Sequence, residues 1–252
     1  MAFNWKKSLL IIIDMVIAVY LVLAVTAFNR PDDHAVICNF VDIQIEQDVV
    51  EGFLTNDKIK DILNQHRMNP LTQPMHDINT RNIEDLLESN NLVEQVECYK
   101  TTTGRVYIAI KQRIPILHVM ADNGETYYVD SHCTIIPQHK FTSNSLVATG
   151  HISKSYAQRV LAPMVNTVLT DKFWKNQIVQ INVLQDGSIE LVPRVGEHIA
   201  YLGQPVNIVH KLERLRKFYK LGLSQAGWNK YSRISVEFDN QIICTRRAKT
   251  RK

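Results

Sequence analysis

Four neighbouring residues near the middle of the chain are each of a type that performs catalysis in enzymes: Asp130, Ser131, His132 and Cys133. A nucleophilic hydrolase needs a serine or cysteine, a base beside it and a third group that orients the base. Consecutive residues cannot assemble in this way, because neighbours on a strand point to opposite faces and turn side chains splay outward. The stretch ETYYVDSHCT, residues 125–134, therefore predicts a strand followed by a turn, and no active site.

Other residues with reactive or ligating side chains are equally unsupported as sites. Glu125 and Asp130 have an odd spacing that places them on opposite faces of a strand, which does not suit a glycosidase. No GxSxG or HExxH motif is present among the serines and the nine histidines. The sequence predicts no catalytic residue, no cofactor and no metal site. The cysteines are too far apart for zinc-ligand spacing, and three disulfide pairings or four free thiols stay open for Cys38, Cys98, Cys133 and Cys244.

Length and charge bound the class of protein. The chain has 252 residues, of which 45% are hydrophobic, so it can bury the core of one large or two small domains. The formal net charge is only +4, and acidic residues occur throughout, so nucleic-acid binding is not expected. The one basic cluster is the C-terminal tail, which we expect to be solvated: Arg246, Arg247, Lys249, Arg251 and Lys252.

The N-terminal segment decides the expected compartment. Residues 9–28 are largely apolar and would form a helix about 30 Å long, the thickness of a bilayer core. We predict a single transmembrane helix there, after a cytoplasmic tail at 1–8 whose Lys6 and Lys7 follow the positive-inside rule. A cleaved signal peptide is the alternative, although its apolar region is usually shorter. Asp14 is costly in a membrane and counts against both interpretations.

After a linker at 29–38, the next elements follow the order β-α-α-β-β. Alternating apolar residues predict a strand at 40–46, and helical stripes predict helices at 55–65 and 78–91. The runs VEQVECYK and RVYIAIKQR predict a hairpin that turns near Gly104. Such elements form a small sheet covered by two helices on one face.

The second half alternates further hairpins with helices. Turns are predicted at Asp122-Asn123-Gly124 and at Asp186-Gly187, because these residues tolerate positive φ. Amphipathic patterns predict a helix within 153–171 and another within 206–223, the latter with a solvated basic side. Residues 231–247 form two strands, and the last strand should lie at a sheet edge.

The chain resembles the FtsQ/DivIB family of bacterial cell-division proteins. The resemblance rests on the β-α-α-β-β module after one apolar segment, on Arg113 and Pro115 after its last strand, and on the YYVD run at 127–130. The family usually has a glycine in the next turn, where this chain has SHC. The resemblance implies an α+β protein, with an N-terminal transmembrane helix, a POTRA domain at 39–113, a mainly antiparallel β domain at 114–247 and a basic tail at 248–252.

What the family does follows from the same resemblance. It implies a non-enzymatic scaffold, held in the inner membrane at the division septum with its C-terminal domain in the periplasm, that links division proteins and regulates septal peptidoglycan synthesis. The implied partners are FtsB/DivIC-type and FtsL-type proteins, with an FtsK-type protein as a candidate for the POTRA domain. The resemblance places partner binding on the last strands, at Tyr231, Ser232, Ile242, Ile243, Cys244 and Thr245.

Three alternatives stay open. Arg246 and Arg247 are also residues that protect an exposed sheet edge from aggregation, without any partner. A POTRA-bearing chaperone or transport accessory would bind extended substrates by strand addition. An anchored cell-wall hydrolase would need Cys133 and a histidine from elsewhere in the chain.

Overall fold

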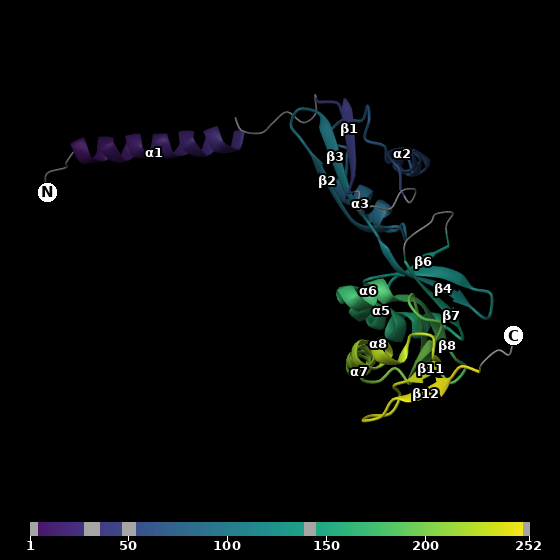
Figure 1. Cartoon of the computed structure of the whole chain (residues 1–252). Helices are drawn as coiled ribbons and strands as arrows, with labels where there is room; N and C mark the ends of the chain where they lie inside the picture. Colours follow the sequence, from purple (N-terminus) through teal and green to yellow (C-terminus); the bar gives the residue numbers. More distant parts are fainter. Residues whose placement is uncertain (1–4, 28–35, 47–53, 139–144, 249–252) are drawn as a thin grey trace. The chain divides into compact units, whose positions relative to one another are not determined.

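A computed structural model describes residues 5–27, 36–46, 54–138 and 145–248, with side chains in the first range described for 12–24 (Figure 1). The chain forms two compact units. The first contains residues 1–44, 56–87 and 96–109, and the second contains 45–55, 88–95 and 110–252.

The N-terminal helix α1 spans Trp5–Ala27. Its side chains from Ile12 to Leu23 are exposed. In the part of the chain that the structure describes, no helix combines the length and the hydropathy that crossing a bilayer requires. Part of the predicted span, residues 9–11 and 25–28, lies outside the described side chains, and the transmembrane helix stays a prediction.

The small sheet has the strand order β1-β3-β2, and it forms as the sequence predicts. Strands β2 and β3 are joined by a turn in which Gly104 has φ 78° and the N–H of Thr101 donates to the carbonyl of Arg105. Helices α2 and α3 supply buried Ile59, Leu63, Ile83 and Leu87. The elements are β1 Phe40–Glu46, α2 Asn56–Gln65, α3 Thr80–Glu88, β2 Val93–Lys100 and β3 Arg105–Gln112.

The large sheet has nine strands in the order β12-β11-β10-β9-β8-β7-β4-β5-β6. Five neighbouring pairs are antiparallel, and β4·β7, β7·β8 and β10·β11 are parallel. The prediction of a mainly antiparallel sheet is therefore confirmed. The strands are β4 Pro115–Ala121, β5 Thr126–Asp130, β6 Ile135–Pro137, β7 Leu146–Gly150, β8 Ile178–Val183, β9 Ile189–Pro193, β10 Ile199–Gly203, β11 Tyr231–Ser235 and β12 Ile243–Arg246.

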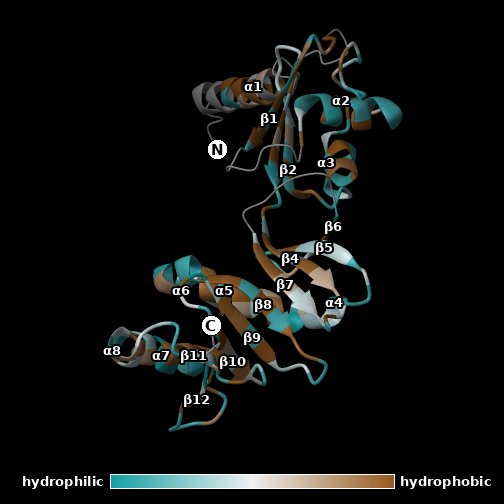
Figure 2. Cartoon of the chain, turned by 45° about the vertical axis from the view of Figure 1, so that its right-hand side comes forward, coloured by the Kyte–Doolittle hydropathy of each residue, from teal (hydrophilic) through white to brown (hydrophobic). Residues whose placement is uncertain are grey.

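One face of this sheet is covered by helices, as Figure 2 shows for α5, α6 and α7. The register places Leu117, Ala148, Ile181 and Ile234 on that face, and all four belong to the core that also contains Leu161 of η1. The covering segments are α4 Lys154–Tyr156, the π-helix η1 Ala157–Leu161, α5 Ala162–Thr170, α6 Lys172–Gln177, α7 Ile208–Phe218, the π-helix η2 Tyr219–Leu223 and α8 Ser224–Ala226.

Two details differ from the sequence-based expectation. Helix α6 was not predicted, and it begins because Asp171 accepts hydrogen bonds from the backbone N–H groups of Phe173 and Trp174. On α7, the basic side is not fully solvated. Lys211 is only 6% exposed, and its Nζ donates to the carbonyls of Leu202 and Gln204 at 2.9 and 2.8 Å.

Candidate functional site

The turn after β5 is organised by the carboxylate of Asp130, which is 2% exposed. Its Oδ1 accepts hydrogen bonds from the backbone N–H groups of His132 and Thr134 at 3.0 and 2.7 Å. Its Oδ2 lies 2.8 Å from Nη1 of Arg113, with which it forms an ion pair. Asp130 therefore stabilises the turn and neutralises the charge of Arg113, so its role is structural.

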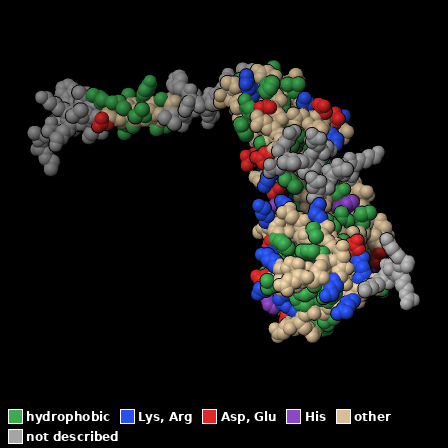
Figure 3. All heavy atoms as spheres, viewed as in Figure 1, with side chains coloured by type: hydrophobic (Ala, Val, Ile, Leu, Met, Phe, Trp, Pro, Cys, Tyr) green, Lys and Arg blue, Asp and Glu red, His purple; other side chains and the backbone are tan. Residues whose placement is uncertain are grey.

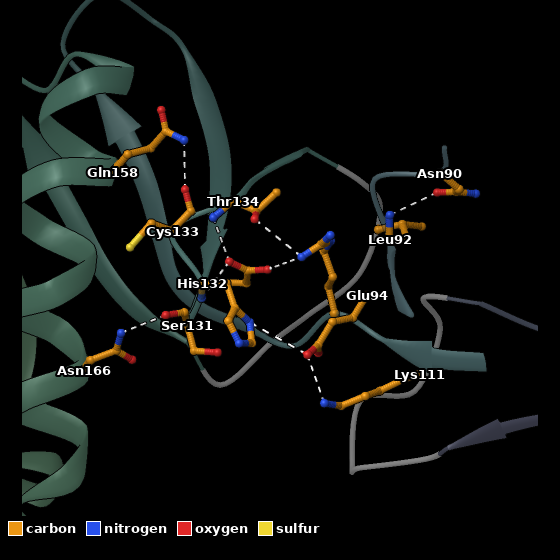
Figure 4. A network of polar contacts seen from close by, with 12 residues as sticks. Asn90, Leu92, Glu94, Lys111, Ser131, His132, Cys133, Thr134, Gln158 and Asn166 are labelled. Atoms are coloured by element: carbon orange, nitrogen blue, oxygen red, sulfur yellow. Dashed lines mark hydrogen bonds and ion pairs between the residues drawn. The ribbon is translucent and has the colours of Figure 1, made fainter. Parts of the chain in front are cut away.

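Ser131, His132 and Cys133 do not converge on a common point. Figure 4 shows the sulfur of Cys133 and the ring of His132 pointing in different directions. The thiol packs against the core, whereas the imidazole is exposed and lies 3.8 Å from Glu94 Oε1. No nucleophile and base meet in this turn. The geometry gives no support to the hydrolase that would use Cys133.

The turn lacks the expected glycine, and one of its residues adopts an unfavourable backbone conformation instead. Cys133 has φ 63°, in the left-handed region that a side chain disfavours. Two side chains from the covering helices hold the turn: Gln158 donates to the carbonyl of Cys133 at 2.8 Å, and Asn166 donates to the carbonyl of Ser131 at 2.9 Å. These two contacts fix the local path without a glycine.

The cysteines are all free thiols. Burial raises the pKa of Cys98 to about 12, and burial also raises the pKa of Cys38 and of Cys244. A thiol with a raised pKa holds little reactive thiolate at neutral pH. These three side chains are therefore poor nucleophiles.

The predicted partner-binding residues lie together at the end of the large sheet. Tyr231 and Ser232 lie on β11. Ile243, Cys244 and Thr245 lie on β12, which is the last strand at this end of the sheet. Ile243 is 50% exposed, Thr245 is exposed, and Cys244 is half-buried against the core. Ile242 precedes the strand. Tyr231, Ile242 and Cys244 pack against the core, whereas Ile243 and Thr245 are exposed on the opposite face, so the six residues share this edge of the sheet but not one face.

The hydrogen-bond register identifies which backbone groups of β12 face outward. The N–H of Val236 donates to the carbonyl of Tyr201 on β10, so the alternate residues Arg233 and Ser235 direct their backbone groups toward β12. Their partners are Thr245 and Ile243. The backbone groups of Cys244 and Arg246 consequently face the free edge.

A groove that the sequence did not predict adjoins this edge. It has a volume of about 490 Å³ and is lined by Phe218, Leu221, Gly222, Arg214, Lys217, Asn240, Gln241 and Ile242. Arg214 fixes its rim, because its guanidinium donates to the carbonyls of Val236, Phe238 and Gln241. The only signal in the sequence is Leu221, an apolar residue off the buried stripe of the helix, which is 70% exposed.

Charge around the second unit is mixed. On the face drawn in Figure 3, Lys and Arg side chains are interspersed with acidic and hydrophobic ones. Arg247 pairs with Glu197 at the end of the β12 region. Among the side chains described at 12–24, 36–46, 54–138 and 145–248, no group of three or more His, Cys, Asp or Glu residues is arranged to hold a metal ion.

Comparison with known families matches both halves of the chain. A family model described as "FtsQ/DivIB, C-terminal related" matches residues 114–245, more than half of the 252 residues. A model described as a POTRA-like domain matches residues 36–111. None of the curated proteins matches the chain. The resemblance inferred from the sequence is confirmed by these two matches.

Proposed function

Because this chain belongs to the FtsQ/DivIB family of bacterial cell-division proteins, we propose that it is a non-enzymatic scaffold of the division machinery. Membership of the family implies a role in cell division at the membrane. The scaffold links partner proteins through its extracytoplasmic domains and thereby regulates septal peptidoglycan synthesis. The domains are a POTRA domain at 39–113 and a β domain at 114–247.

The anchor of this scaffold is the apolar segment 9–28. It holds the chain in the inner membrane as a single-pass protein, with Lys6 and Lys7 in the cytoplasm and the domains in the periplasm. An anchor confines several modest interfaces to one surface. Such confinement raises the effective concentration of each partner, so weak pairings add up to a stable complex.

The observation that carries the proposal is the free edge of β12. The outward backbone groups of Cys244 and Arg246 offer hydrogen bonds to an added strand. Exposed Ile243 and Thr245 offer side-chain contacts on the face away from the helices. The partners are FtsB/DivIC-type and FtsL-type proteins, and an FtsK-type protein binds the POTRA domain.

The test uses the purified full-length chain and the extracytoplasmic parts of the FtsB-type and FtsL-type proteins of the same genome. Cys244→Pro removes an outward N–H without touching the β11 ladder, so we expect affinity to fall at least about tenfold, the loss of a hydrogen bond. Arg247→Ala is a control, because Arg247 is paired with Glu197 and its backbone N–H donates to Lys230.

Two results would overturn the proposal. Absence of binding by the parent chain would remove the scaffold role at this edge. Equal binding by the parent and by Cys244→Pro would move the interface elsewhere, and Arg246 would then serve only to protect the edge from aggregation. Ile243→Pro is unsuitable as the probe, because the backbone N–H of Ile243 faces Ser235 within the sheet.

A further inference from the structure

The small sheet of the first unit has two edges, and they differ. On β2, the backbone N–H of Cys98 donates to Glu84 Oε1 of α3 at 2.7 Å. Lys100 then reaches from the same strand to the carbonyl of Met75 at 2.6 Å. The Glu84 side chain thus already accepts the outward N–H of Cys98 on β2. This edge is partly closed to an added strand.

Within the described part of the chain, the β1 edge is closed just before the strand begins. The N–H of Cys38 donates to Gln73, the N–H of Thr72 donates back to Cys38, and Ile37 forms an antiparallel bridge with Pro74. The N–H of Asn39 instead donates to Gly104, on the β3 side. Residues along an extended strand alternate in direction, so even-numbered residues direct their backbone groups away from β3.

Among the residues that the structure describes, none pairs with the outer side of β1 beyond this point. Asp42 and Gln44 face outward beyond the point where residues 72–75 stop. Phe40 also faces outward, and its carbonyl accepts a contact from the Cys38 thiol at 3.6 Å. The loop at 72–75 shows that this edge accepts an antiparallel segment. A further segment would continue the same ladder.

A groove runs beside the open edge. Its volume is about 280 Å³, and its lining is mostly apolar: Phe40, Val41, Ile43, Leu63, Leu71, Asn39, Asn69 and Lys60. Phe40 and Leu71 on its border are 49% and 46% exposed. Lys60 is exposed and makes no hydrogen bond or ion pair within the part of the chain that the structure describes. The groove thus joins apolar surface, a backbone edge and one unpaired positive charge.

We propose that the β1 edge and this groove form a second binding site, which takes an extended polypeptide segment of another protein as an added strand. Alternate apolar side chains of the segment enter the groove beside Ile43 and Leu63, and an acidic side chain pairs with Lys60. A second copy of β1 is a poor occupant. An antiparallel pair centred on Asp42 would place two aspartates opposite each other.

The experiment uses the full-length protein in detergent and two fluorescent synthetic peptides. Both alternate valine with threonine, and they differ at one groove-facing position, which is glutamate in one and lysine in the other. We expect saturable binding of the glutamate peptide, measured by fluorescence polarisation. Asp42→Pro removes an outward N–H and should weaken binding at least about tenfold.

Lys60→Glu provides a matched test that leaves the backbone unchanged. It should reverse the preference, so that the lysine peptide binds more tightly than the glutamate peptide. This exposed substitution does not disturb packing, so an unfolded variant cannot mimic the result. The proposal is wrong if neither peptide binds saturably, or if binding ignores both substitutions. Asp42→Pro and Lys60→Glu leave the β12 edge unchanged, so any binding of the peptides at that edge is insensitive to both substitutions. Failure of this test therefore leaves the division-scaffold proposal untouched.

Discussion

At the scale of single residues, Asp130, one of the side chains that first suggested catalysis, stabilises the backbone of a turn. Asp130 accepts two turn amides and pairs with Arg113, while Gln158 and Asn166 hold the carbonyls of Cys133 and Ser131. The sequence predicted the turn, because strand alternation forbids a catalytic cluster of neighbours. It did not predict the ion pair or the helix contacts, since those depend on residues far away in the chain.

The ion pair of Asp130 leads to a prediction about stability. Asp130→Ala should lower the free energy of unfolding by about 3 kcal/mol, because it leaves partly buried Arg113 without a counter-charge and frees two turn amides. Asp122→Ala is the control, since Asp122 pairs with His151 on the exposed surface and should cost less than about 0.5 kcal/mol. Chemical denaturation measures both. Similar losses for the two variants would contradict the role of Asp130.

The left-handed conformation of Cys133 gives a second prediction. Both Cys133→Gly and Cys133→Ala lose the thiol, but only glycine is relaxed at φ 63°. The glycine variant should therefore be more stable than the alanine variant by about 1 kcal/mol. At Ala162, a helical residue with φ −62°, a change to glycine should instead destabilise the protein. Thermal unfolding compares the variants, and a more stable Cys133→Ala would refute the argument.

At the scale of elements, locally coded features were predictable and distant pairings were not. Asn-Gly and Asp-Gly turns fixed two hairpins, and the apolar stripe of α7 correctly placed Leu212 and Leu215 inward. The parallel pairing of β7 with β4 and β8 has no local signal. Nor has the burial of Lys211, whose partners are carbonyls that the end of β10 brings to it. The groove beside β12 was missed for the same reason.

The contact between η2 and His198, the residue before β10, leads to a prediction about pH. His198 and Tyr219 are both buried, with 2.7 Å between Nε2 and the hydroxyl oxygen. Burial lowers the pKa of His198, so the unfolded chain binds a proton more readily than the folded chain. This group's contribution is fully present above the ordinary histidine pKa, about 6.5, and is lost as the pH falls below it toward the folded value.

Thermal unfolding between pH 7 and pH 5 checks this direction. The parent should lose stability as the pH falls, and His198→Phe should lose less over the same interval, although it is less stable at pH 7 for want of the bond to Tyr219. His151→Phe is the control, because His151 is exposed. Identical pH profiles for the parent and His198→Phe would contradict the assignment.

At the scale of the whole molecule, the proposed function depends on holding two binding edges at one membrane. The two sheets each end in a strand with outward backbone groups, β12 in the second unit and β1 in the first. If both proposed sites bind, their attachment to one chain makes a joint complex tighter than either contact alone. The sequence predicted the C-terminal edge by family resemblance, while the proposal of a β1 site rests on the hydrogen-bond directions in the folded chain.

The anchor proposed for residues 9–28 has its own test. With a tag at each end of the chain, both tags should remain on one polypeptide in the membrane fraction, released by detergent and not by alkaline carbonate. The C-terminal tag should be sensitive to protease added from the periplasmic side. Recovery of a shortened, soluble chain without the N-terminal tag would instead establish a cleaved signal peptide.

Single-amide hydrogen exchange on the full-length chain tests most directly whether a partner strand pairs with β12. Addition of the FtsB-type partner should slow exchange at Cys244 and Arg246, whose N–H groups face outward, at least about tenfold. Ile243 and Thr245 already donate toward β11 and should change much less. Binding that leaves the amides of Cys244 and Arg246 unprotected would contradict strand addition at this edge.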